Sequence, residues 1–85
     1  MHCWIYRSPR RDEMYLYLAR EDDFDVLPET LLRGFGSPQA VMSLKLDEQR
    51  PLARARVTEV IDALREQGYF LQLPPKLRPA LYFGD

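Results

Sequence analysis

Residues 2–19, HCWIYRSPRRDEMYLYLA, hold two apolar segments separated by a short polar one. The first apolar segment, His2 to Arg7, and the second, Met14 to Ala19, are rich in aromatic and aliphatic residues and predict two β-strands. The segment Ser8 to Glu13 between them predicts a turn, because Pro9 has no amide hydrogen for a strand ladder and most of its neighbours are charged. Two strands joined by so short a connection predict a β-hairpin, and the rest of the fold is built around it.

The segment after the hairpin predicts one short helix and one strand. Pro28 begins the helix at a position where a missing amide hydrogen costs nothing, and Gly34 and Gly36 are expected to end it. A third strand is predicted from Pro38 to Leu46. Its alternate apolar side chains are expected on one face of the sheet: Ala40, Met42, Leu44 and Leu46.

The C-terminal half predicts one long helix and a last strand. Apolar residues recur every three or four positions between Leu52 and Gln67, which is typical of a helix that buries one face, and Gly68 is suited to end it. The residues of this stripe are Ala53, Val57, Val60, Ile61 and Leu64. Tyr69 to Leu73 predicts a fourth strand, which Pro74 and Pro75 stop.

The element order β-β-α-β-α-β predicts an α/β fold with a small mixed sheet of about four strands, because helices between strands provide crossover connections. The long helix cannot cover both faces, so the short helix or the C-terminal tail covers part of the second face, or that face is open. We expect residues 1–75 to form one domain and residues 76–85, which include Pro79, to form a tail.

Composition narrows the classes of function. The chain has 85 residues, so it is one domain too small to enclose a deep substrate pocket by itself. A net charge of −1 argues against a general electrostatic attraction to nucleic acid or anionic lipid. One cysteine permits no internal disulfide, no apolar run approaches the roughly 20 residues of a membrane span, and the first residues are typical of a strand rather than a signal peptide. We therefore expect a cytoplasmic protein without a membrane partner.

Several short motifs along the chain resemble those of the YcgL family, small proteins found mainly in gammaproteobacteria. They are CWIYRS (3–8), RD (11–12), YLY (15–17), DF (23–24), FGSP (35–38) and GYFLQLPP (68–75). The resemblance covers residues 2–75, and it implies a compact α/β/α-type sandwich with helices on both faces of the sheet. It implies no reaction, cofactor or catalytic residue, and the nearness of family genes to that of ribonuclease D in some genomes points to RNA metabolism. The tail departs from the family, in which the segment after the double proline is often longer and more polar.

The hairpin offers the first candidate site. Because side chains alternate along a strand, we expect the aliphatic side chains of both strands in the core under the long helix and the aromatic ones on the other face. There the rings can form a stacking platform with a basic rim, as in proteins that bind single-stranded nucleic acid. The residues of this nucleic-acid site are Trp4, Tyr6, Arg7, Arg10, Arg11, Tyr15 and Tyr17. In the alternative interpretation the tail or the short helix covers the rings, which then form a second core.

Other polar residues offer less complete sites. One is an acidic loop, which consists of Glu21, Asp22, Asp23 and Asp25. Its carboxylates could hold a divalent metal, together with Asp12 and Glu13 of the hairpin turn. In the alternative interpretation the loop is simply solvated. A candidate anion site lies at the start of the long helix and consists of Arg50, Arg54 and Arg56. In the alternative interpretation these long side chains simply turn into solvent.

His2 and Cys3 are single copies, and neighbouring strand residues point to opposite faces, so we expect neither a zinc site nor a catalytic pair. Cys3 is expected in the core, and no cofactor is predicted. We therefore predict an interaction domain that binds single-stranded nucleic acid or an RNA-processing protein and is an accessory to RNA metabolism. The alternatives are a small metal-dependent hydrolase or nuclease, and a protein–protein adaptor.

Overall fold

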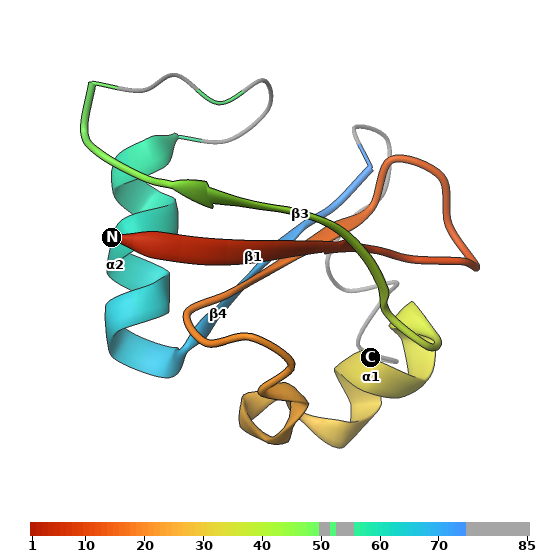
Figure 1. Ribbon diagram of the computed structural model, residues 1–85. Coiled ribbons are helices and arrows are strands. Elements are labelled where there is room, and N and C mark those ends of the chain that lie inside the picture. Colours follow the sequence, from red (N-terminus) through yellow and green to blue (C-terminus); the bar gives the residue numbers. More distant parts are fainter. Residues whose placement is uncertain (50–51, 53–55, 75–85) are drawn as a thin grey trace.

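A computed structural model describes residues 1–49, 52 and 56–74 (Figure 1). The predicted element order is confirmed, with one addition, the 3₁₀ helix η1. The elements are β1 (His2–Arg7), β2 (Tyr15–Leu18), η1 (Phe24–Val26), α1 (Glu29–Phe35), β3 (Gln39–Lys45), α2 (Val57–Gln67) and β4 (Tyr69–Gln72). The tail 76–85 lies outside the described residues.

The four strands form one sheet in the order β3-β1-β2-β4, and every neighbouring pair is antiparallel. The α/β class and the strand count are as predicted, but the expectation of parallel neighbours in a mixed sheet is wrong. The chain does cross over between β2 and β3, which run in the same direction. Because β1 lies between these two strands, the crossover leaves only antiparallel neighbours.

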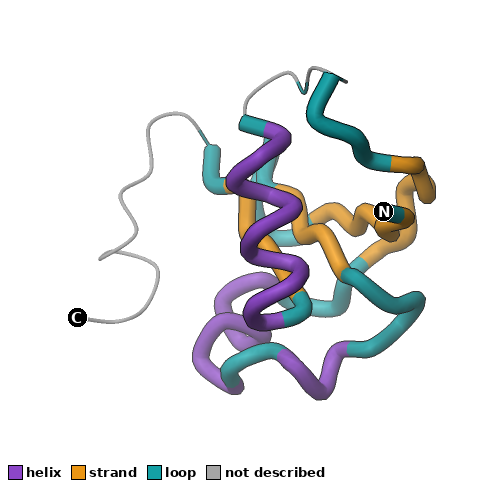
Figure 2. The backbone as a smooth tube through the Cα atoms, turned by 90° about the vertical axis from the view of Figure 1, so that its left-hand side faces the viewer, coloured by secondary structure: helices purple, strands orange, loops and turns teal. Residues whose placement is uncertain are grey.

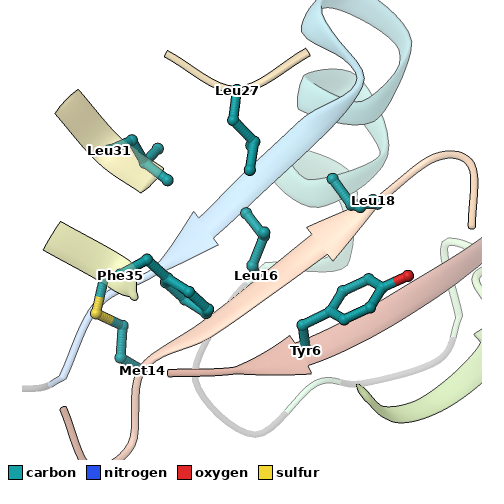
Figure 3. Packing of buried hydrophobic residues seen from close by; sticks show 7 residues of the cluster. All are labelled: Tyr6, Met14, Leu16, Leu18, Leu27, Leu31 and Phe35. Atoms are coloured by element: carbon teal, nitrogen blue, oxygen red, sulfur yellow. The ribbon is translucent and has the colours of Figure 1, made fainter. Parts of the chain in front are cut away.

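The first face of the sheet is covered by η1 and α1. Side chains from β1 and β2 meet side chains of this crossover in one apolar cluster (Figure 3), which consists of Tyr6, Met14, Leu16, Leu18, Leu27, Leu31 and Phe35. Trp4, Tyr69 and Leu71 pack at its margin. We call this side of the sheet the α1 face.

The second face is covered by α2, which lies against the sheet in Figures 1 and 2. The cluster under this helix consists of Cys3, Ile5, Tyr17, Leu46, Val60, Ile61 and Leu64. We call this side the α2 face. Helices therefore pack on both faces, as the family resemblance implied, and Cys3 is buried as expected.

Two helix boundaries differ from those predicted. The long helix begins at Val57 rather than Leu52, and Leu52 itself is not helical. Gly34 lies inside α1, which ends at Phe35, and Gly36 directly after it has a positive φ of 83°, which favours glycine. Gly68 ends α2 with φ of 88°, as predicted. Among the described helices, none has the length and apolarity needed to cross a membrane.

Candidate functional site

The hairpin rings do not share one face. The strand register places Tyr6 opposite Leu16 and Ile5 opposite Tyr17. Because directly opposite residues of an antiparallel pair project to the same side, Trp4 and Tyr6 lie on the α1 face while Tyr15 and Tyr17 lie on the α2 face. The expectation of one aromatic platform is therefore wrong, since a ring on β1 is opposed by an aliphatic side chain on β2.

Two of the four rings belong to the core. The Tyr6 side chain is 2% exposed, and its hydroxyl donates a hydrogen bond to Oδ1 of Asp22 at 2.9 Å. The Tyr17 side chain is 6% exposed, and its hydroxyl donates to Oε1 of Gln72 at 3.0 Å. Burial raises the pKa of both tyrosines, which are thus neutral and hydrogen-bonded as buried tyrosines require.

The predicted arginines divide between two hollows at the hairpin turn. Arg7, Arg11 and Tyr15 line one of about 440 Å³, together with the carboxylates of Asp12 and Glu13. Arg10 lies instead in a hollow of about 450 Å³ beside α1, where its Nη1 donates to the carbonyl of Arg33 at 3.0 Å. The predicted nucleic-acid site is therefore reduced to one half-buried ring and two arginines.

Ser8 organises this turn and was not recognised in the sequence. Its hydroxyl donates to the carbonyl of Phe35 at 2.6 Å and accepts hydrogen bonds from the amides of Arg10 and Arg11 at 3.1 and 3.2 Å. The hydroxyl thus holds the basic turn against the end of α1. A serine directly before Pro9 is the only sequence signal for this role.

The candidate carboxylates lie at two ends of one strand. Asp12 and Glu13 precede β2, whereas the loop from Glu21 to Asp25 follows it, so the hairpin turn does not join the acidic loop. The described part of the chain contains no group of three or more His, Cys, Asp or Glu side chains placed to hold a metal ion.

The candidate anion site at α2 is only partly described. Arg56 lies at the N-cap position, where its Nη1 is 3.8 Å from Oε1 of Glu59, and both side chains are exposed. The predictions for Arg50 and Arg54 fall outside the described residues.

The outer strand β3 is the most exposed element of the sheet. It pairs with β1 on one side, and within the described chain no strand lies on its other side. Val41 and Met42 are 48% and 50% exposed, and only Leu44 of its seven residues is half-buried. An open strand with exposed apolar side chains is a ready template for a further strand.

A β-bulge alters the expected alternation along β3. The register advances by two residues on β3 and by one on β1, so that Ala40 is opposite Tyr6 and Met42 is opposite Ile5. Ala40 therefore faces the α1 side and Met42 the α2 side, which corrects the prediction that they share one face. Val41 is the extra residue of the bulge.

A groove of about 270 Å³ lies along β3. The residues that line it from β1 are Trp4, Ile5 and Tyr6, and the loop after β2 contributes Glu21 and Asp22. Within β3 the lining residues are Ala40, Val41, Met42 and Ser43. Ala40 and Ser43, the residues of β3 opposite Tyr6 and Trp4, are small, and the half-buried ring of Trp4 is the accessible one of the two rings.

The Tyr6 hydroxyl fixes the acidic wall of this groove. Besides donating to the Asp22 carboxylate, it accepts a hydrogen bond from the Asp22 amide at 2.8 Å. Asp22 has φ of 57°, a left-handed conformation that aspartate tolerates better than most residues. The two hydrogen bonds hold Glu21 and Asp22 beside the ring of Tyr6, while both residues remain exposed.

The sequence of residues 3–75 matches the family model described as the YcgL domain. A protein of Salmonella arizonae described as "Protein YcgL" is 55% identical over 75 residues, which are 88% of this chain and 68% of that protein. A "YcgL domain-containing protein" of Erwinia tasmaniensis is 52% identical over 81 residues, 95% of this chain and 89% of that protein. The matched residues 3–75 include residues of all seven described elements.

Proposed function

The chain belongs to the YcgL family, and on this premise we propose that it is an interaction domain that binds an extended segment of a partner protein along the open edge of β3. The observation that carries this proposal is the exposure of β3. This outer strand is seven residues long, and two of its large apolar side chains, Val41 and Met42, are exposed to solvent. A partner segment that adds to such an edge gains main-chain hydrogen bonds as well as apolar contacts.

The composition of β3 supports this role. Outer strands usually avoid unwanted pairing through short length, prolines or several lysines. β3 has one lysine, Lys45, at its last position, and Pro38 precedes it rather than interrupting it. Besides Lys45, β3 is protected by the bulge at Val41, which leaves Met42–Lys45 as the regular part of the edge that a partner strand can pair with.

Site-specific photocrosslinking in cells tests this proposal. We would replace Met42 by the photoreactive residue p-benzoylphenylalanine, express the full chain in Salmonella and identify the crosslinked protein by mass spectrometry. The matched control carries the same residue in place of Glu66, an exposed position on α2. We expect one reproducible protein adduct from position 42 that is lost when Val41→Lys is added. Adducts of equal yield from both positions would contradict the proposal.

A second candidate function keeps the reduced nucleic-acid site. One observation favours it: Arg7, Arg11 and Tyr15 line the same hollow at the hairpin turn, so one base can stack on the ring while the guanidinium groups contact phosphates. An accessory role in RNA metabolism would use this hollow. With two arginines, affinity should be modest and should fall only gently with salt.

Fluorescence anisotropy of labelled single-stranded RNA and DNA tests the second candidate. Arg7→Ala with Arg11→Ala should abolish binding, whereas Arg65→Ala, which removes an exposed arginine from α2, should leave it unchanged. Binding that survives the double substitution, or no binding of any oligonucleotide at low salt, would eliminate this hollow as a nucleic-acid site.

A further inference from the structure

The groove beside β3 has the shape and charge of a specificity pocket. Along the α1 side of the open edge, the rings of Trp4 and Tyr6 form its floor and the loop residues Glu21 and Asp22 form its acidic wall. Its described lining contains these two carboxylates and no cationic side chain. The pocket therefore attracts a positive charge that arrives from the edge.

The distance across β3 selects a long side chain. Neighbouring strands lie about 4.8 Å apart, so a residue on a strand added outside β3 must reach across β3 to touch a ring on β1. The residues it passes over on this face are Ala40 and Ser43, which are small. Lysine and arginine combine such length with a terminal charge, and an apolar stem that fits beside Val41.

The floor favours a cation as well. Trp4 is half-buried, and His2 contacts its ring with a centroid separation of 5.0 Å. A cationic group over an indole face gains a cation–π interaction, and arginine in addition stacks through its planar guanidinium and pairs with a carboxylate through two hydrogen bonds. The carboxylate of exposed Glu21 is suited to such a pair.

We infer that the partner segment bound along β3 carries a basic side chain, arginine best, which enters the groove between Trp4 and the Glu21–Asp22 loop. This inference rests on the proposed function and names the chemistry of its partner. A second copy of the chain fits less well. If the β3 strands of two copies paired antiparallel along their whole length, Lys45, the one cation of β3, would lie beside Gln39 of the other copy, away from the groove.

Selection of displayed peptides tests the inference. A library of random 12-residue peptides is selected against the full chain, against Glu21→Lys and against the matched control Glu66→Lys, which makes the same change of charge on α2. We expect the wild-type chain and the control to enrich peptides with arginine or lysine at one fixed position among β-forming residues. The Glu21→Lys chain should lose that preference and enrich aspartate or glutamate there. Because Glu21 is exposed, unfolding in urea should be unchanged.

Affinity measurements give the second readout. A selected peptide should quench Trp4 fluorescence, and changing its basic residue to glutamine should weaken binding about five- to tenfold. Peptides that require β3, as shown by loss of binding to Val41→Lys, but have no basic preference would overturn the inference and leave the proposed function standing. Absence of any β3-dependent peptide would overturn both. A dimer in light scattering that Val41→Lys dissociates would overturn the inference in favour of a second copy.

Discussion

β3 and β4 are the two outer strands of the sheet, but β4 is largely buried whereas β3 is largely exposed. All four side chains of β4 are buried or half-buried. Tyr69 and Leu71 pack on the cluster of the α1 face and Phe70 on that of the α2 face, while Gln72 accepts the hydrogen bond of Tyr17. On β3, six of seven residues are exposed. The sheet therefore uses one edge for its own stability and presents the other.

The difference follows from how each strand is connected. Gly68 alone separates α2 from β4. Because the connection is so short, β4 lies beside the helix that covers the α2 face and contacts it directly. β3 leaves α1 through residues 36–38 and contacts mainly β1. Because most side chains of β3 are exposed, we expect them to contribute little to the free energy of unfolding. The following substitutions measure this difference between β3 and β4.

The largest effect should come from the helix that covers β4. Ile61 lies on the buried side of α2, so Ile61→Ala should lower the free energy of unfolding by about 2–5 kcal/mol, through lost burial and the cavity left behind. Urea unfolding measures this loss. Met42→Ala on β3 is the control and should change the value by less than about 0.5 kcal/mol. Equal losses at the two positions would remove the distinction between the edges.

The next effect lies on β4 itself. Phe70 is half-buried, and its ring meets that of Tyr17 edge-to-face with a centroid separation of 5.8 Å. We expect Phe70→Ala to cost about 1.5–3 kcal/mol, less than a fully buried phenylalanine because part of the ring is already exposed. Val41→Ala on β3 should cost under about 0.5 kcal/mol by the same urea measurement. A larger loss at Val41 than at Phe70 would reverse the comparison.

A hydrogen bond distinguishes the two edges in the same way. Gln72→Leu on β4 leaves the buried Tyr17 hydroxyl without its acceptor and should cost about 1–3 kcal/mol. On β3, Gln39 accepts from Nε of Arg7 at 2.9 Å in an exposed pair, and Gln39→Leu should cost under about 0.5 kcal/mol. Adding Tyr17→Phe to Gln72→Leu should recover part of the loss in thermal unfolding. No recovery would show that Gln72 acts by packing alone.

Alkaline pH should weaken the fold through Tyr17, whose hydroxyl bonds to Gln72 of β4. Burial raises the pKa of Tyr17 above its usual value near 10, so the folded protein resists an ionisation that the unfolded chain accepts. Stability is therefore complete below about pH 10 and declines as pH rises through the raised folded pKa. Urea unfolding between pH 8 and 11 should show a shallower decline for Tyr17→Phe. Parallel pH profiles of the two proteins would contradict this role of Tyr17.

The sequence predicted each strand well and their relation poorly. The alternation of Cys3, Trp4 and Ile5 indicates which side chains oppose one another within β1, but nothing local fixes whether Tyr6 meets Leu16 or Tyr17 across the hairpin. A turn without Asn-Gly or Asp-Gly does not set the register, and a shift of one residue moves every side chain to the other face. The prediction of one aromatic platform was wrong for this reason.

The groove could not be predicted for a related reason. The bulge that separates Ala40 from Met42 on β3 has no mark such as a glycine in the sequence, and the approach of Asp22 to Tyr6 joins residues 16 positions apart. Pro28, Gly68 and the apolar stripe of α2, by contrast, act within a few residues. They predicted the start of α1, the end of α2 and the helix over the α2 face.

Amide hydrogen exchange along β3 tests the open edge most directly. In the dilute free protein, the amides of Met42–Lys45 that face away from β1 should exchange fast, while those of β4 that bond to β2 exchange slowly. Adding a peptide selected on the full chain should slow the outward β3 amides at least about tenfold, as new ladder hydrogen bonds form. Outward amides that stay fast in the presence of bound peptide, or that are already slow without it, would contradict strand addition at β3.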